Sequence, residues 1–189
     1  MIERTLQRDY YFSPEIFQQE KERIFCREWF CAGREEELPE PGDYLVLEVA
    51  GESAIVVRTR EGDLAAHYNV CRHRGSRLVP EACKGSFATI RCPYHSWTYA
   101  LDGKLRTASF LDEEDGLTKA DLGLYPVGVE SWGGFFFLNL TPDEAQTRGH
   151  NLRSQLGGVP ERLCRYPLEQ LRSARRMVYE VSANWKVLL

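Results

Sequence analysis

Two cysteines and two histidines stand at spacings that could hold a metal. Cys71 and His73 lie in the run C-R-H-R-G, and Cys92 and His95 lie in the run C-P-Y-H-S-W-T-Y. Each pair is close enough for one loop to present two ligands. The long interval between the pairs lets two loops approach one centre from opposite sides. Thiolates and imidazoles bind zinc and one class of iron–sulfur cluster, so the pattern predicts a metal centre.

Two kinds of centre fit this ligand set. A structural zinc site usually pairs cysteine with cysteine and histidine with histidine along the chain, whereas here each run supplies one of each. In one class of [2Fe–2S] cluster, histidines replace two of the four cysteines on one iron. Gly75 and Pro93 suit tight loops whose backbone N–H groups point at cluster sulfurs. We therefore favour the cluster, with the cysteines on the ferric iron and the histidines on the iron that changes valence.

The same runs resemble the signature of the Rieske non-haem iron oxygenases, at the N-terminal end of the α subunit of ring-hydroxylating dioxygenases. The likeness continues through D-G-K-L at 102–105, G-L-Y-P-V at 123–127, W-G-G-F-F-F-L-N-L at 132–140 and N-W-K at 184–186, and so covers nearly the whole chain. The resemblance implies a Rieske [2Fe–2S] cluster on the two cysteines and two histidines named above.

Five neighbours of these ligands are expected to act around the cluster. Arg74 follows the family's C-x-H-R pattern and could hydrogen-bond near the cluster or contact the electron donor. Ser96 stands where the family more often has glycine; its hydroxyl either faces solvent or donates to a cluster sulfur. Trp97 is expected to pack over the cluster and to form part of a docking face. Tyr94 and Tyr99 are expected to shield the site from water.

The resemblance also implies a reaction and its partners. Electrons would pass from NAD(P)H through a separate reductase, or a ferredoxin, to this cluster, and then to a mononuclear Fe(II) in a neighbouring subunit of a homotrimer. That iron needs two histidines and a carboxylate. Only His67 and His150 remain unassigned, and neither has partners at a suitable spacing. We expect the mononuclear iron site beyond Leu189, in a catalytic domain, so that the chain is a fragment of a longer oxygenase or a truncated reading frame.

The substrate and two rival functions stay open. The run C-R-H-R-G-S-R-L is similar to oxygenases of quaternary ammonium compounds, such as the glycine-betaine type, but aromatic-ring dioxygenases share most of it. The first rival is a stand-alone electron carrier of the Rieske ferredoxin type, and the second is a metal-binding module without turnover. A helix before residue 30 and the segment 150–189 exceed what a carrier needs, and they favour the oxygenase.

Composition excludes several other classes. The 189 residues carry 24 Lys and Arg against 28 Asp and Glu, a net charge of −4, which gives no footprint for nucleic acid. No apolar run is long enough to span a membrane, and the first residues open no secretory leader, so a cytoplasmic protein is expected. The remaining cysteines show no disulfide framework and are expected to be small buried side chains; they are Cys26, Cys31, Cys83 and Cys164.

The fold expected around the two runs is mainly β. We predict a small antiparallel Rieske-type barrel or sandwich with flanking helices and the start of an α+β catalytic domain. Three parts are expected: an N-terminal helical arm (1–38), the Rieske domain (39–145), and a linker with the truncated start of the catalytic domain (146–189). Strands are predicted at 29–32, 44–49, 54–59, 64–69, 87–91, 97–100, 127–130, 134–140 and 175–182.

Other segments are predicted from local signals. Ser13 and Pro14 predict the start of a helix over about 14–28. Asp102-Gly103 predicts a hairpin turn, and Pro142 predicts the start of a short helix. Residues 146–160 are glycine-rich and are expected to be a linker, with helix possible over 163–171. The acidic runs 35–37 and 112–115 and the side chains of Arg72 and His150 are expected to be solvated, and His67 to be packed or at the surface.

Overall fold

A large curled antiparallel sheet and a small sheet make up the body of the protein. The computed structural model describes residues 5–80, 83–109, 118–175 and 177–188. In the described part of the chain the large sheet has the strand order β1-β10-β9-β4-β3-β2-β5, and the small sheet has the order β6-β7-β8. The strands are β1 Phe30–Arg34, β2 Asp43–Val49, β3 Glu52–Arg58, β4 Leu64–Tyr68, β5 Lys84–Ser86, β6 Ile90–Arg91, β7 Thr98–Tyr99, β8 Leu105–Thr107, β9 Pro126–Trp132 and β10 Phe135–Asn139.

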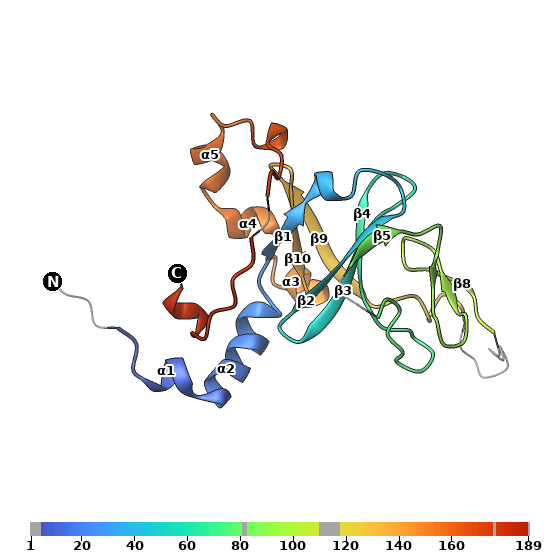
Figure 1. The fold of residues 1–189 in the computed structure, drawn as a ribbon, viewed down its shortest axis with the longest axis horizontal. Coiled ribbons are helices and arrows are strands. Elements are labelled where there is room, and N and C mark those ends of the chain that lie inside the picture. The colour runs from blue at the N-terminus through green and yellow to red at the C-terminus, as the bar shows by residue number, and fades with distance from the viewer. Residues whose placement is uncertain (1–4, 81–82, 110–117, 176, 189) are drawn as a thin grey trace.

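Short helices gather at one end of the large sheet, and the small sheet lies at the other (Figure 1). The α-helices are α1 Asp9–Phe12, α2 Pro14–Glu20, α3 Pro142–Thr147, α4 Leu152–Leu156 and α5 Val159–Leu163. A π-helical turn follows α2 at Lys21–Phe25, and 3-10 turns lie at Glu35–Glu37, Leu168–Gln170 and Trp185–Val187. The mainly β class predicted from the sequence is confirmed.

The large sheet is buried on both faces at its centre. Successive side chains of a strand point to opposite faces. On β3, Ile55 and Val57 therefore belong to one hydrophobic cluster, and Ala54 and Val56 belong to the other. This explains why β3 reads as an unbroken apolar run instead of an alternating one. The first cluster fills the space toward the small sheet and contains Cys71 and Cys92.

The predicted strands of the body are largely confirmed. The strands predicted at 44–49, 54–59, 64–69, 127–130 and 134–140 correspond to β2, β3, β4, β9 and β10. The strands predicted at 87–91 and 97–100 shorten to the two-residue β6 and β7. The predicted turn at Asp102-Gly103 joins β7 to β8, with the Ala100 N–H donating to the Lys104 carbonyl at 2.8 Å. Gly103 has φ +85°, a value that favours glycine.

The N-terminal segment differs in detail from the prediction. Ser13 caps α2, its hydroxyl accepting a hydrogen bond from the Ile16 N–H at 3.2 Å. The helix ends at Phe25 instead of residue 28, and α1 adds a turn inside the expected arm. Pro14 disfavours helical φ/ψ for the residue before it, and Ser13 is extended, so α1 and α2 are separate. The strand predicted at 29–32 begins one residue later, as β1, and is bulged between Cys31 and Gly33.

The acidic run 35–37 is not the solvated face that was expected. It forms a 3-10 turn whose carboxylates meet arginines. Arg34 Nε lies 3.6 Å from a Glu36 carboxylate oxygen, and Arg58 Nη1 lies 3.7 Å from Glu35. These contacts hold the turn against the sheet. The other acidic run, 112–115, lies outside the described residues.

The segment after β10 is where the structure differs most from the prediction. Residues 146–160, expected to be a linker, contain α4 and the start of α5. Asn151 caps α4, its side chain accepting from the Ser154 N–H at 2.9 Å, and Leu152 is buried. The Gln155 amide bonds both the N–H and the carbonyl of Trp29. The helix predicted over 163–171 is reduced to the end of α5 and one 3-10 turn. The short helix after Pro142 is confirmed as α3.

The strand predicted at 175–182 is wrong. The described residues of this segment form no strand. Its apolar side chains Met177, Val178, Tyr179 and Val181 are exposed. Beyond it, Trp185 Nε1 and Lys186 Nζ both donate to the Glu20 carboxylate, at 2.9 and 2.6 Å. The two ends of the described chain are thereby joined through α2.

Candidate metal centre

Two loops of the same construction carry the four candidate ligands. In the first, the Cys71 N–H donates to the Ser76 carbonyl at 2.8 Å, and the Gly75 N–H donates to the Cys71 carbonyl at 3.0 Å. In the second, the Cys92 N–H donates to the Trp97 carbonyl at 2.8 Å, and the Ser96 N–H donates to the Cys92 carbonyl at 3.1 Å. Each cysteine therefore begins a tight turn that brings the histidine of its loop to the same side.

The loops meet with cysteine beside cysteine and histidine beside histidine. Cys71 and Cys92 are each 2% exposed, and their thiols are close enough to hydrogen-bond. His73 and His95 are half-buried, with ring centroids 4.7 Å apart and planes at 68°. The sulfur pair lies in the hydrophobic core and the imidazole pair lies nearer the surface. A cluster with two cysteines on one iron and two histidines on the other requires this pairing.

One buried atom at the centre lacks the partner that a metal would supply. His73 Nδ1 is buried and has no hydrogen-bond partner among the described residues. Backbone N–H groups already point at the sulfurs: that of His73 at Cys71, and those of Tyr94 and His95 at Cys92. Such donors stabilise negative charge on sulfur. The donor set and the unpartnered nitrogen fit a [2Fe–2S] cluster.

Metal binding requires thiolate and neutral imidazole, and burial affects the two kinds of ligand in opposite ways. Burial lowers the pKa of His73, and the charges of His95 and Arg74 add to the effect. Burial raises the pKa of Cys71. Burial also opposes ionisation of Cys92, but hydrogen bonds from the His95 and Tyr94 N–H groups outweigh it, and the pKa of Cys92 falls below its ordinary value. These pKa shifts favour the neutral form of His73 and the thiolate of Cys92, whereas Cys71 ionises less readily than a free cysteine.

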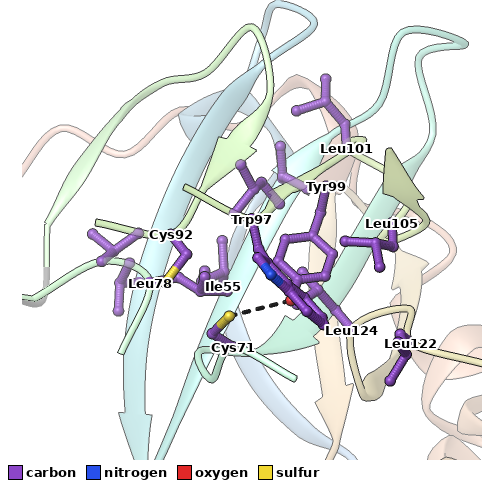
Figure 2. Close-up of a cluster of buried hydrophobic side chains, with 14 residues drawn as sticks. Ile55, Cys71, Leu78, Cys92, Trp97, Tyr99, Leu101, Leu105, Leu122 and Leu124 are labelled. Atoms are coloured by element: carbon purple, nitrogen blue, oxygen red, sulfur yellow. Dashed lines mark hydrogen bonds between the residues drawn. The ribbon is translucent and has the colours of Figure 1, made fainter. Parts of the chain in front are cut away.

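Tyr99 contacts the centre more directly than the sequence suggested. Its hydroxyl lies 3.3 Å from Cys71 Sγ (Figure 2). The same hydroxyl accepts a hydrogen bond from the Arg72 N–H at 3.1 Å. Because the Arg72 N–H already donates to it, the hydroxyl is free to donate its own hydrogen to the sulfur. Burial raises the pKa of Tyr99, so the hydroxyl keeps that hydrogen. The sequence held one signal for this contact, because Tyr99 lies only four residues after the candidate ligand His95.

The other aromatic neighbours cover the two histidines. Trp97 stacks on His73 with centroids 4.8 Å apart and planes at 8°, and its Nε1 donates to the Ser109 carbonyl at 3.0 Å. Trp97 is buried, so it packs at the centre as expected but does not present a docking face. Tyr94 lies on His95 at 3.7 Å and is 62% exposed. Tyr94 thus covers the outer imidazole, and Trp97 supports the inner one.

Ser96 occupies a backbone position that favours glycine. Its φ is +62°, and Gly75, at the equivalent place in the first loop, has φ +69°. This explains why the family more often has glycine there. Of the two roles considered for the hydroxyl, the structure favours the surface: it accepts from the Arg91 guanidinium at 2.9 Å. Arg74 is exposed, beside His73.

Two side chains expected to be solvated are held in place. Arg72 Nη1 donates to the Gly123 carbonyl at 3.0 Å, and the guanidinium lies 3.9 Å over the Tyr125 ring. His150 Nδ1 lies 3.6 Å from the Glu28 carboxylate, and its carbonyl accepts from Trp29 Nε1 at 2.9 Å. Both predictions of free exposure were wrong.

The remaining candidate residues lie outside the centre. His67 is packed, as expected, with its Nε2 3.0 Å from the Leu101 carbonyl. Cys83 and Cys26 are half-buried, whereas Cys31 and Cys164 are exposed, so the prediction of burial was wrong for the last two. Cys83 contacts the Tyr44 hydroxyl at 3.7 Å.

Comparison with known families agrees with this geometry. The model of the Rieske [2Fe–2S] domain family matches residues 28–123, and the chain belongs to this family.

Similar proteins are subunits of oxygenases. The chain is 38% identical to the carnitine monooxygenase oxygenase subunit of Acinetobacter baumannii, over 98% of this chain and 49% of the relative. It is 36% identical to the glycine betaine monooxygenase oxygenase subunit of Chromohalobacter salexigens, over 98% and 40%. The crystal structure of the quaternary ammonium Rieske monooxygenase CntA with gamma-butyrobetaine superposes with a TM-score of 0.87 at 36% identity, over 97% of this chain and 52% of that one. The chain spans about half the length of the relatives it matches.

Proposed function

We propose that Cys71, His73, Cys92 and His95 hold a Rieske [2Fe–2S] cluster through which the chain transfers electrons in the oxygenase subunit of a quaternary ammonium monooxygenase. The observation that carries the proposal is the pairing of two buried sulfurs with two imidazoles, one of which has an unpartnered buried nitrogen. When bound, such a cluster accepts and releases one electron at a higher potential than an all-cysteine cluster, because the histidines are neutral ligands.

The protein's own groups would shape that electron transfer. Tyr99 and the backbone N–H groups stabilise charge on the sulfurs, and Trp97 fixes the ring of His73. If Nδ1 of His73 binds iron, the proton of that ring stays on Nε2, and this N–H can donate a hydrogen bond to a partner's carboxylate. The ring of Tyr94 lies on His95 and limits the access of water on that side.

The donor, the second iron and the assembly follow from the same proposal. A reductase using NAD(P)H, directly or through a ferredoxin, would supply electrons. A mononuclear Fe(II) in a catalytic domain would receive them, within a homotrimer in the cytoplasm. Residues 1–38, 39–145 and 146–189 would serve as the helical arm, the Rieske domain, and the segment leading into the catalytic domain. Among the described residues, no helix is both long and apolar enough to cross a membrane.

The substrate class proposed is quaternary ammonium instead of aromatic. The relatives named for carnitine and glycine betaine match 98% of the chain, and this similarity supports the choice. The test is oxygen uptake by the full-length protein with its reductase. Uptake dependent on carnitine, glycine betaine or choline is expected, and uptake stimulated only by an aromatic hydrocarbon would overturn this choice.

The cluster itself is tested with the purified protein. Iron and acid-labile sulfide should be present in equal amounts, and the dithionite-reduced protein should give a rhombic EPR signal with an average g of about 1.9, as expected when nitrogen ligates one iron. Alanine at Cys71, His73, Cys92 or His95 should abolish the cluster, whereas Cys83→Ser should leave iron content unchanged. Zinc in place of iron, or full iron and sulfide in His95→Ala, would refute the assignment.

A further inference from the structure

The first ligand loop depends on one buried amide. Asn69 is 4% exposed and lies two residues before Cys71. Its Oδ1 accepts hydrogen bonds from the Leu78 N–H at 3.1 Å and the Val79 N–H at 2.9 Å. Its Nδ2 donates to the Val79 carbonyl at 2.8 Å and to Ser53 Oγ at 3.1 Å. All four hydrogen-bonding positions of the amide are used.

These bonds fasten both ends of the loop that carries Cys71 and His73. The loop leaves the large sheet at the end of β4 and returns through Leu78 and Val79, which belong to no strand. Among the described residues, backbone pairing within this loop is limited to an isolated bridge between Val70 and Arg77 and the turn at Cys71. The second ligand loop differs, because β6 and β7 pair directly on either side of it. The first loop therefore depends on the Asn69 side chain for the support that paired strands give to the second loop.

Ser53 extends the attachment to the surface of the large sheet. Its hydroxyl donates to the Glu48 carboxylate at 2.8 Å and accepts from Arg77 Nη2 at 2.7 Å. Arg77 also forms an ion pair with Glu48. The Asn69 N–H donates to the Ser53 carbonyl at 2.9 Å. A residue inside the loop, Arg77, and the residue that closes it, Asn69, are thus tied to the same serine on β3.

We propose that Asn69, seated on Ser53, is a positioning residue that holds the first ligand loop in the geometry the cluster needs and thereby raises its reduction potential. The inference rests on the proposed function, since it takes Cys71 and His73 as ligands. With the loop fixed by Asn69, the His73 N–H and the Tyr99 hydroxyl remain within hydrogen-bond distance of Cys71 Sγ. Donors to sulfur stabilise the more negative reduced state, so a looser loop shifts the equilibrium toward the oxidised state.

The test compares two variants of this network with a matched control. Asn69→Asp removes the donor but also adds a carboxylate near the cluster, so Ser53→Ala, which removes one partner of the amide without adding a charge, is the deciding variant. Asn139 is the control, because it is also a fully buried asparagine that bridges segments, donating to the Arg27 carbonyl and accepting from the Thr141 N–H, both at 2.8 Å. Asn139→Asp makes the same chemical change on β10, away from both ligand loops.

We expect Asn69→Asp and Ser53→Ala to move the one-electron reduction equilibrium about threefold to tenfold toward the oxidised form, about 30–60 mV, and to alter the EPR g values. Asn139→Asp should lower the unfolding temperature but leave both quantities unchanged. Wild-type potential and g values in both network variants would refute the inference. If Asn69→Asp does not fold, Ser53→Ala decides it alone. A wild-type protein without iron and sulfide would refute the proposed function, and the inference with it.

Discussion

Replacing Tyr99 by phenylalanine removes one hydrogen bond from the candidate centre and keeps the ring that packs in the core. The hydroxyl that is lost lies 3.3 Å from Cys71 Sγ. A hydrogen bond to a charged group contributes about 1.5–3 kcal/mol. Both oxidation states of a cluster have anionic sulfurs, so only part of that energy differs between them. If the difference is about 1 kcal/mol, the potential falls by about 40 mV, because a tenfold change in a one-electron equilibrium is about 59 mV.

The assay is a redox titration of Tyr99→Phe followed by EPR, with iron and sulfide measured on the same samples. Tyr44→Phe is the matched control, since the Tyr44 hydroxyl also contacts a cysteine, Cys83, which is not a candidate ligand. The control should retain the wild-type potential. An unchanged potential in Tyr99→Phe with a complete cluster would show that the hydroxyl does not donate to the sulfur, and the argument would fail.

Three further predictions concern pH, stability and surface charge. Burial lowers the pKa of His67 below the ordinary value of 6.5, so the unfolded chain takes up the proton at higher pH than the folded one. The contribution of His67 to the free energy of unfolding, measured with urea, should therefore be complete above about pH 6.5 and fall below it by at most about 1.4 kcal/mol per pH unit. His67→Gln, which can still donate to the Leu101 carbonyl, should remove this contribution and make the dependence on pH less steep. Glu20→Gln, which breaks the pair with Lys186, should lower the free energy of unfolding by about 1–3 kcal/mol, whereas the exposed Glu161→Gln should leave it unchanged. Arg74→Glu and Arg91→Glu should slow oxidation of the reduced protein by anionic ferricyanide and accelerate its oxidation by a cationic cobalt complex, because each exchange reverses a surface charge near the centre. Added salt should weaken both effects. Wild-type oxidation rates in these variants, or the same change in rate in the distant Arg153→Glu, would contradict this prediction.

The candidate ligands could be predicted from the sequence because residue type and spacing both carry information. Few side chains bind iron, and a tight turn that presents two of them needs a short spacing. The central strands were predictable for a similar reason, since a buried strand such as β3 has a run of β-branched residues bounded by turns. Both signals are local, so a single sequence is enough to find them.

The failures concern interactions between distant segments. The sequence of 175–182 was interpreted as the alternation of a strand, but a strand also requires a neighbour, and none of the described residues pairs with this segment. Glycines made 146–160 look like a linker, although Gln155 binds Trp29 and Leu152 enters the core. Asn69 was placed at the end of a strand, and its partners Ser53 and Val79 carry no pattern that links them to it. Hydrogen-bond partners far apart in sequence leave no periodic signal.

The strand order also has a consequence for how the chain folds during synthesis. β1 is made before every other strand, yet its only strand partner among the described residues is β10, the last strand. The Glu20 carboxylate likewise has its partner, Lys186, 166 residues further along the chain. Contacts between such distant residues form slowly, and domains generally fold as they leave the ribosome. The hairpins β2–β3 and β3–β4 can pair early, whereas β1 lacks its strand partner until β10 has been made, and Glu20 of α2 lacks its partner until Lys186 has been made. While the intervening residues are being made, the nascent chain therefore presents an unpaired strand, β1, and a carboxylate, Glu20, without its partner. The N-terminal segment is where we expect chaperones to bind.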